Sequence, residues 1–548
     1  MSREHEPEFS VVRNLLWPVH RSEFRKFLPL AITILVITFN FSILKTIKDT
    51  IIITAAGSEA IPFLKLWVML PAAFLVSILL GWCSTRFSRK KTFISAQLFF
   101  IGFFLFFSTV LFPMREWIHP HAWVASWREV LPQGLGGMLS LVEYWSYTLF
   151  YLFAELFGVV ILSVMFWGFV NQVTQLQQAK RFYGLLNLVG NLPCVLAPLA
   201  LNFMIDWILK NQQASQEDRW ESVVSSSGIL VASLGLVGVV SYWFAEKYAE
   251  QEAALETSSS SSKKSLKSKK PKASLVEGFR LLASDSYVRN IGILVLAYNI
   301  VINLLEVVWK EQVSQLYPDK LEFSMYMNQV MTATGFVGIF CAMFLGTGLV
   351  RRFGWAMTAF ATPFVIVLTG VPFLGCVVFT EEMSGVADYF GMTSLSLAVM
   401  MGAGLSVVSK AVKYSLFDTS KELAFIPMDE QTRGYSKAAI DGVCSRIGKS
   451  GGSAILQICF FVFGGIGAST PAVLIAVLVL LVGWGKSILD LGAQFDERCD
   501  LSNHDQSGPS GSQNPPAQKP TRVIETTKNH VNRSAGAVCA GPQIAATI

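Results

Sequence analysis

The sequence predicts an all-α, polytopic membrane protein with twelve transmembrane helices in two six-helix halves. Of its 548 residues, 52% are hydrophobic and only 15% are charged, whereas a soluble domain carries about 25% charged residues. Apolar segments of 18 residues or more recur along the chain, and each is long enough to cross a bilayer as a helix. A Ser/Lys-rich segment near the middle of the chain divides them six and six.

The twelve spans follow from these apolar segments, taken in chain order. Each edge is placed where polar residues or clusters of Gly and Pro begin, and is defined to within several residues. The predicted spans lie near residues 28–46, 62–83, 92–113, 145–170, 185–207, 225–245, 288–309, 327–349, 355–380, 389–412, 439–466 and 471–490.

The remaining segments are polar. The run ETSSSSSKKSLKSKKPKAS between the halves cannot bury an apolar core. The N-terminal segment holds acidic residues and has no apolar stretch of its own, so it predicts neither a cleaved signal peptide nor a transit peptide. The predicted domains are a cytoplasmic segment at 1–27, six-helix halves at 28–245 and 288–490, a cytoplasmic linker at 246–287 and a disordered cytoplasmic tail at 491–548.

Basic residues predict the orientation, since Lys and Arg accumulate in cytoplasmic loops. They are frequent before the first span, in alternate loops and in the linker, whereas the connection TEEMSGVAD has none. Both termini and the linker are therefore expected in the cytoplasm. The short basic turns STRFSRKK and VRRFGW follow the second and eighth spans, which indicates internal symmetry. Two related six-helix halves around a midplane site are typical of major-facilitator-like transporters.

Charge and cysteine content exclude several other classes of protein. The net charge of +6 resides in short connecting segments, so it reports orientation and predicts no nucleic-acid partner. The eight cysteines are scattered, without the spacing of a zinc site or a disulfide framework. We expect no metal, no cofactor and a monomer in contact with membrane lipid.

The segment GVCSRIGKSGG ends in the Gly-Lys-Ser of a phosphate-binding P-loop. That motif needs a Gly five residues before the Gly-Lys-Ser glycine, and Val443 stands there. The flanking residues predict one long, mostly apolar helix rather than a strand, a loop and a helix. A membrane NTPase is therefore only a remote alternative.

Ionic side chains recur at helical spacing inside two predicted spans. In span seven, Asn299, Asn303, Glu306 and Lys310 follow at i, i+4, i+7 and i+11, which is one helical face. Span one has the same spacing at Thr38, Ser42, Lys45 and Asp49, with Lys48 one turn from Lys45. Superposing the first helices of the two halves sets Lys45 against Glu306, and Asp49 against Lys310. We expect the two stripes to face each other across a cavity.

Two further spans carry similar stripes. In span four, the side chains at intervals of four residues are polar, and Glu155 lies deep in the apolar run; they are Glu143, Tyr147, Tyr151 and Glu155. Span eleven places Arg446, Lys449, Ser453 and Gln457 on one side. Three glycines of this segment would let neighbouring backbones approach closely; they are Gly448, Gly451 and Gly452.

Each stripe also has a purely structural interpretation. Lysines and aspartates near helix ends can extend to the interface, and Tyr147 can be an interfacial anchor. Glu155, Glu306 and Lys449 lie deeper, where the structural alternative is an ion pair that only holds helices together.

An excess of cations in a desolvated cavity needs anionic partners. Phosphate groups supply them, since Arg and Lys are the usual phosphate ligands; the candidates are Lys45, Lys48, Arg446 and Lys449. Asp49, Glu155, Glu306 and Lys310 would balance or couple these charges. A base or ribose could contact Tyr147, Tyr151, Asn299 and Asn303. A polyphosphate or nucleotide is favoured over a sugar, with other phosphorylated or dicarboxylic anions as the alternative.

Several of these segments resemble the ATP/ADP translocase family of chlamydiae, rickettsiae and plastids, and the pattern is most similar to chlamydial members. The resemblance covers residues 10–490 and is most specific in KYSLFDTSKELAFIPMDEQTRGYSKAAIDGVCSRIGKSGG. It implies a bacterial cytoplasmic-membrane protein that exchanges external ATP for internal ADP and phosphate, with no catalytic residues. It also implies four functional charges, at Lys48 in KTIKD, Glu155 in FAELFG, Glu306 in NLLEVVWK and Lys449 in IGKSGG.

The sequence departs from this family in span one. In the strict ATP/ADP exchangers of the family that this chain resembles, the sequence there is usually Arg-Asp-Thr-Lys-Asp. This chain has Lys45, Thr46, Ile47, Lys48 and Asp49 instead. An Arg fork becomes a Lys point charge, and one acid is lost. ATP:ADP antiport is expected, and a broader, proton-coupled nucleoside-triphosphate importer is the alternative.

Overall fold

The computed structural model describes residues 19–20, 23–174, 176–259, 275–344 and 348–506. Every regular element within these ranges is a helix, which confirms the predicted all-α class. The N-terminal half consists of α2 (Phe24–Ala56), α3 (Ala60–Phe63), η1 (Leu64–Met69), α4 (Leu70–Arg86), α5 (Arg89–Phe106), η2 (Phe107–Leu111), α6 (Arg115–Ile118), α7 (His121–Val130), η3 (Gln133–Leu135), α8 (Gly136–Glu143), α9 (Trp145–Phe157), η4 (Gly158–Phe166), α10 (Trp167–Val173), α11 (Leu176–Asn191), α12 (Pro193–Asn211) and α13 (Gln216–Ser259).

The C-terminal half begins after the residues of the linker that the structure does not describe. It consists of α14 (Leu275–Ser284), α15 (Ser286–Leu316), α16 (Lys320–Phe344), α17 (Gly348–Val378), α18 (Ser384–Tyr389), α19 (Ser394–Val412), η5 (Lys413–Phe417), α20 (Asp418–Ala424), α21 (Glu430–Ala439), η6 (Ile440–Cys444), α22 (Ser445–Phe463) and α23 (Ile466–Gln506).

Ten helices of the described residues are long and apolar enough to cross a membrane. The eighth and eleventh predicted spans coincide with α16 and α22, which are helical but are not among these ten. Arg446, Lys449 and several Ser and Gly residues make α22 less apolar than a lipid-facing span. The polytopic prediction is thus confirmed, while the number twelve stays a prediction.

Several helices run past the predicted ends of the spans. α13 continues to Ser259, inside the predicted linker, and α14 lies in the same linker. α23 continues to Gln506, inside the predicted tail. The extension of α13 reads AEKYAEQEAALE, and Ala and Glu favour helix without needing burial. Hydropathy therefore marks the apolar part of each helix, and not its end.

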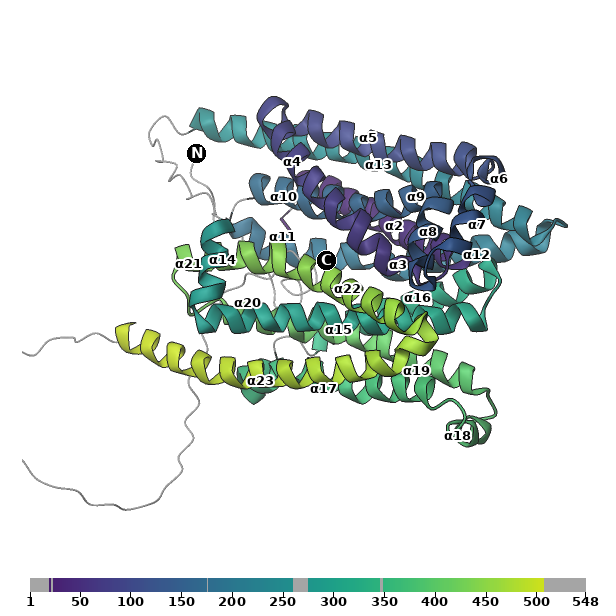
Figure 1. Cartoon of the computed structure of the whole chain (residues 1–548). Helices are drawn as coiled ribbons and strands as arrows, with labels where there is room; N and C mark the ends of the chain where they lie inside the picture. The colour runs from purple at the N-terminus through teal and green to yellow at the C-terminus, as the bar shows by residue number, and fades with distance from the viewer. Residues whose placement is uncertain (1–18, 21–22, 175, 260–274, 345–347, 507–548) are drawn as a thin grey trace, which may run out of the picture.

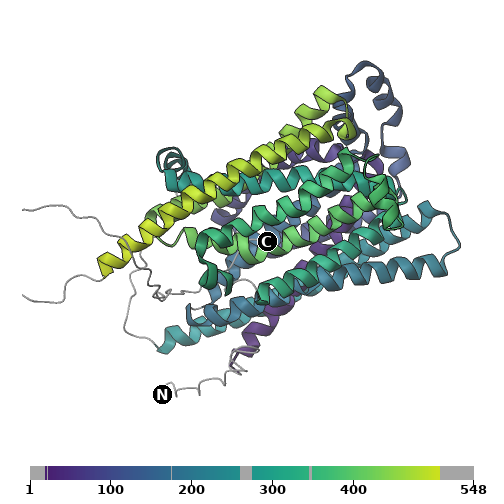
Figure 2. The same cartoon turned by 90° about the horizontal axis from the view of Figure 1, so that it is seen from below.

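The two halves lie against each other as two layers of roughly parallel helices (Figure 1). α14, α21 and the C-terminal end of α23 lie at one end of the molecule, and α6, α7, α8 and α18 lie at the other. The view from below shows the long helices running between these two ends (Figure 2). Contacts between the halves are made by α12 with α16, by α2 with α15 and α16, and by α3 and η1 with α22.

Three π-helical segments lie next to ionic side chains. η1 contains Lys65, η4 begins three residues after Glu155, and η5 begins three residues after Lys410. A π turn widens the helix and redirects the side chains beside it, and such turns are frequent at functional sites.

α22 packs closely on α15 through two glycines. A Cβ on Gly448 would lie 2.7 Å from Cβ of Asn299, and one on Gly452 would lie 3.0 Å from Nδ2 of Asn303. A Cβ on Gly451 would meet nothing closer than 3.9 Å, at Ile300. Two of the three glycines are therefore needed for the helix contact.

We expect Gly448→Val to push α22 away from α15 and to lower the apparent midpoint of thermal unfolding by about 5 °C, since overpacking costs about 1–3 kcal/mol. Gly451→Val has the same effect on helix propensity without the clash, and is the matched control. Thermal unfolding of both purified variants in detergent measures the difference. Equal midpoints would show that the close approach of the two helices is not needed for stability.

Candidate functional site

A chain of buried ion pairs begins on α2. The Lys48 Nζ atom lies 2.7 Å from Oδ1 of Asp49 and 2.9 Å from Oε1 of Glu155 on α9. The same ammonium lies 3.8 Å from the centre of the Tyr151 ring. Lys48 and Asp49 are almost entirely buried, so these contacts neutralise an otherwise costly charge.

The chain of ion pairs continues into the C-terminal half. Lys310 Nζ on α15 lies 2.9 Å from Oδ2 of Asp49 and 3.2 Å from Oε1 of Glu306. The matching stripes of α2 and α15 predicted that these two helices face each other, and the contact between Asp49 and Lys310 confirms this. Asp49 thus accepts hydrogen bonds from two ammonium groups, one from each half.

Lys65 in η1 is a further member that the stripes did not predict. Its Nζ atom donates to Oδ1 of Asn303 at 2.5 Å and lies 4.0 Å from Oε2 of Glu306. Asn303 in turn donates to the backbone oxygen of Lys449 and to Oγ of Ser453, each at 3.0 Å. The sequence signal for Lys65 is a single lysine in the apolar run IPFLKLWVML.

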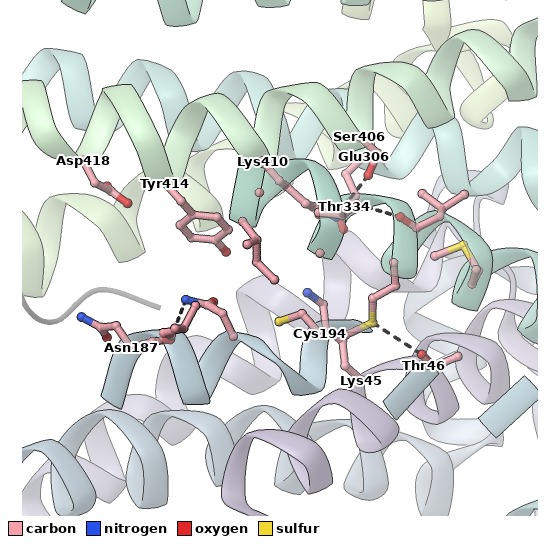
Figure 3. Close-up of a pocket in the computed structure, with 18 of the residues that line it drawn as sticks. Lys45, Thr46, Asn187, Cys194, Glu306, Thr334, Ser406, Lys410, Tyr414 and Asp418 are labelled. Carbon is pink, nitrogen blue, oxygen red and sulfur yellow. Dashed lines mark hydrogen bonds between the residues drawn. The ribbon is translucent and has the colours of Figure 1, made fainter. Parts of the chain in front are cut away.

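A cavity of about 420 Å³ lies between the halves, beside these ion pairs. Figure 3 shows Lys45, Thr46, Asn187 and Cys194 of the N-terminal half on one side. The opposite wall belongs to the C-terminal half, and the labelled side chains there are Glu306, Thr334, Ser406, Lys410, Tyr414 and Asp418. Lys45 and Glu306, which the stripes predicted to be opposed, line the same cavity.

Three lysines of this region have no carboxylate partner among the described residues. Lys45 and Lys410 line the cavity, and Lys410 Nζ donates to Oγ of Ser406 at 3.1 Å. Lys449 is exposed to solvent, and its charge interacts with those of Glu155 and Glu306. Lys48, Lys65 and Lys310, by contrast, are each within 4.0 Å of a carboxylate.

The region therefore holds more positive than negative charge. Its lysines are Lys45, Lys48, Lys65, Lys310, Lys410 and Lys449, and its carboxylates are Asp49, Glu155 and Glu306. Three ammonium groups are left in excess. An anion with several charges is the ligand that such a group of lysines binds best.

Of the twelve predicted site residues, three line the cavity, namely Lys45, Asp49 and Glu306. Lys48, Glu155, Lys310 and Asn303 belong to the chain of contacts beside it, and Lys449 adjoins Asn303. The other four are Asn299, Tyr147, Arg446 and Tyr151. Asn299 packs against Gly448 and donates to the backbone oxygen of Val295 at 2.8 Å. Tyr147 is buried among rings, with the Tyr144 ring parallel at 5.7 Å. Arg446 and Tyr151 do not line the cavity either, although Tyr151 contacts Lys48.

The cavity extends toward one end of the molecule and is closed toward the other. It reaches Gly184 of α11 and Glu422 of α20, on the side where α14 and α21 lie. On the opposite side the halves are joined by direct hydrogen bonds. Gln457 Nε2 donates to the backbone oxygen of Pro62 at 3.0 Å, Trp67 Nε1 donates to Gln457 Oε1 at 3.0 Å, and Ser58 donates to Glu311.

The Gly-Lys-Ser segment lies within a helix, and it opens no phosphate-binding loop. Residues 445–463 form α22, and the preceding residues 440–444 form η6, so no strand or loop precedes the lysine. The backbone amides that would bind phosphate are used in the helix itself. This geometry removes the basis for an NTPase.

Two helical halves around a cavity lined by ionic side chains, closed at one end only, are typical of a secondary transporter. The family model for the TLC ATP/ADP transporter matches residues 2–495. The chain is 37% identical over 499 residues to ADP,ATP carrier protein 1 of Chlamydia pneumoniae, covering 90% of this chain and 96% of that protein. It is 36% identical over 483 residues to the chloroplastic ADP,ATP carrier protein 1 of Arabidopsis thaliana, covering 88% and 76%.

The chain therefore belongs to the TLC ATP/ADP transporter family, which confirms the resemblance in its motifs. As a member of this family it is a secondary transporter and not an enzyme. Among solved structures, a bacterial homologue of the iron transporter ferroportin in an inward-facing state aligns with a TM-score of 0.49 and 14% identity, over 85% of this chain and 100% of that one.

Proposed function

We propose that this protein exchanges ATP for ADP across the bacterial cytoplasmic membrane by alternating access. The observation that carries the proposal is the cavity between the halves, where Lys45 and Lys410 have no carboxylate partner among the described residues. Both named relatives are ADP,ATP carriers, and the phosphates of a nucleotide are anionic partners for these two lysines. The two termini and the linker face the cytoplasm, so the cavity opens inward.

Phosphate binding is assigned to the lysines that lack a partner. Lys45, Lys410 and Lys449 bind the phosphate chain, since each can donate a charge-assisted hydrogen bond without first breaking an ion pair. Lys48 is held by Asp49 and Glu155 and becomes available only when these contacts rearrange. Glu155, Glu306, Asp49 and Lys310 balance the charge as the halves move. The protein acts as a monomer.

Charge balance also favours exchange over net transport. The lysines and carboxylates named above leave three ammonium groups in excess in and beside the empty cavity, and closing it would remove them from water at a cost of several kcal/mol for each ion. A bound nucleotide neutralises them, so that the loaded protein reorients more easily than the empty one. Return to the starting side then needs a second nucleotide, which is the property of an antiporter.

We expect Glu306→Gln to lower ATP uptake at least tenfold, since Glu306 connects Lys310 and Lys65 across the halves and lines the cavity. Labelled uptake into intact bacterial cells that express the protein measures this, with Glu382→Gln on an exposed loop as the control. Uptake by the parent protein should be stimulated by internal ADP and should resist a protonophore.

Two results would overturn parts of the proposal. Unchanged uptake by a normally expressed Glu306→Gln variant would remove Glu306 from the coupling mechanism. Uptake of ATP, GTP and UTP at similar rates, abolished by the protonophore and independent of internal ADP, would favour the proton-coupled importer. This importer is the second candidate, because Thr46 stands in span one where the motif of strict exchangers has an acid.

A further inference from the structure

The cavity has a second region, farther from the ion pairs, with different chemistry. We call this region the mouth and define it by Asn187, Asn191, Tyr414, Asp418 and Glu422, all of which line the cavity. Asn187 and Asn191 lie one turn apart on α11 of the N-terminal half, and the other three belong to η5 and α20. Figure 3 shows Tyr414 and Asp418 facing Asn187 across the open space.

The mouth is polar, but it has no excess of positive charge. Oδ2 of Asp418 lies 2.9 Å from Nζ of Lys413, and Oε2 of Glu422 lies 2.5 Å from Nζ of Lys437. The carboxylates are therefore paired, in contrast to the unpaired ammonium groups of Lys45 and Lys410. The cavity is thus polarised along its length, with an anion-binding end in the middle of the molecule and a neutral, polar end at the mouth.

An aromatic ring is exposed in the mouth. The Tyr414 side chain is 44% exposed, whereas Tyr298 and Trp309 nearby are almost completely buried. The Lys413 ammonium lies 4.4 Å from the centre of the Tyr414 ring. An exposed ring in a cavity between two halves is a stacking surface for a flat ligand, and stacking on an aromatic side chain stabilises any nucleobase.

Two amides face this ring from the other half. Asn191 Nδ2 donates to the backbone oxygen of Asn187 at 2.9 Å, which leaves Asn191 Oδ1 available to a ligand. The Asn187 amide makes no hydrogen bond of its own among the described residues. An Asn amide both donates and accepts, and this is the complement of the N6 and N7 atoms of adenine.

We propose that the mouth is a nucleoside subsite, in which Tyr414 stacks on the base while Asn187 and Asn191 bind its polar edge. The inference rests on the proposed function and adds the direction of the bound nucleotide. Its phosphates lie at Lys45 and Lys410, and its base lies toward the end of the molecule where α14 and α21 lie. Tyr414 belongs to the C-terminal half and the two amides to the N-terminal half, so base selectivity depends on both halves.

Binding of labelled ATP to the purified full-length protein in detergent tests this, with unlabelled ATP, GTP, UTP and inorganic tripolyphosphate as competitors. Tripolyphosphate has the anionic groups without a base. We expect Tyr414→Ala to weaken ATP binding about tenfold, from the usual contribution of one stacked base, and to change tripolyphosphate binding less than twofold. Tyr414→Phe should keep the affinity of the parent protein.

The amides are tested by selectivity. We expect Asn187→Ala and Asn191→Ala to reduce the preference for ATP over UTP about tenfold, since they remove contacts to the base edge. Tyr389→Ala and Asn211→Ala are matched controls. Tyr389 is 85% exposed on α18, and Asn211 makes the same kind of hydrogen bond to a backbone oxygen as Asn191, but outside the cavity.

The outcomes separate this inference from the proposed function. The nucleoside subsite is wrong if the parent protein binds ATP no more tightly than tripolyphosphate. It is also wrong if Tyr414→Ala weakens the binding of ATP and of tripolyphosphate equally. If the parent protein binds no nucleotide at all, the proposed function itself is wrong. Should Tyr414→Ala fail to fold, Tyr414→Phe and the selectivity of the two Asn variants decide, and an unchanged selectivity in both Asn variants overturns the subsite.

Discussion

The Lys410→Gln variant is expected to bind ATP about thirtyfold more weakly than the parent protein. Lys410 lines the cavity, has no carboxylate partner among the described residues and is held only by Ser406 at 3.1 Å. Its ammonium is therefore free to donate to phosphate, and a hydrogen bond to a charged group contributes about 1.5–3 kcal/mol, with tenfold in affinity for each 1.4 kcal/mol. Competition binding in detergent measures the change.

Two variants control this result. Lys410→Arg keeps the positive charge and should recover most of the affinity, because guanidinium also binds phosphate. Lys486→Gln removes a lysine exposed on α23, outside the cavity, and should leave binding unchanged. The salt dependence provides a separate check, since the loss of one ionic contact should make ATP binding less sensitive to ionic strength. Parent-like affinity in Lys410→Gln would place the phosphate chain elsewhere.

Helical periodicity correctly predicted the ion pair between Asp49 and Lys310, and the reason is geometric. Asp49 and Lys310 occupy equivalent positions on the first helix of each half, so that an approximate twofold relation between the halves places them opposite each other. The structure puts them 2.9 Å apart. Ionic groups at equivalent positions in the two halves therefore predict a contact between the halves. The pattern of one helix alone does not predict such a contact.

The same reasoning missed Lys65 and Lys410, for two related reasons. Lys65 is a single lysine without a polar partner at i+4 or i+7, so no stripe marks it. Lys410 lies in a stripe with Ser406, Tyr414 and Asp418, at intervals of four residues, which the prediction overlooked. Each also lies in or beside a π-helical segment, where the spacing of 3.6 residues per turn no longer gives the direction of a side chain. Hydropathy places both within a span, but only the packing shows that they face the other half.

Periodicity identifies the face of a helix but does not show what covers it. Asn299 and Glu306 share one face of α15, yet α22 covers Asn299 through Gly448, while Glu306 lines the cavity. Tyr147 and Tyr151 are likewise one turn apart on α9. Tyr151 contacts Lys48, whereas Tyr147, in the first turn of the helix, packs against Tyr144.

The second large effect is expected at Asp49. Asp49→Asn removes the carboxylate that binds both Lys48 and Lys310, which are among the most buried charged groups of the protein. Removing one partner of a buried ion pair costs about 3–5 kcal/mol, so the apparent midpoint of thermal unfolding should fall by about 10 °C. ATP exchange should be lost as well. Thermal unfolding in detergent and labelled uptake into cells measure the two effects separately.

The matched control removes a carboxylate from a buried lysine within one half. Lys421 is also almost fully buried, and its Nζ atom lies 2.8 Å from Oδ1 of Asp441 in the same C-terminal half. Asp441→Asn should lower the midpoint of unfolding but leave ATP exchange measurable. If it abolished exchange as completely as Asp49→Asn does, the loss of transport at Asp49 would follow from instability alone.

A double variant separates stability from transport. Asp49→Leu combined with Lys310→Met replaces the ion pair between the halves with apolar side chains, and such replacements are often neutral or stabilising. We expect the double variant to unfold at a higher temperature than Asp49→Asn, yet to exchange no ATP, because an apolar contact cannot change partners when the halves separate. Lys48 keeps Glu155 as its partner in this variant. Exchange at the parent rate would mean that Asp49 and Lys310 only hold the halves together and take no part in the reorientation.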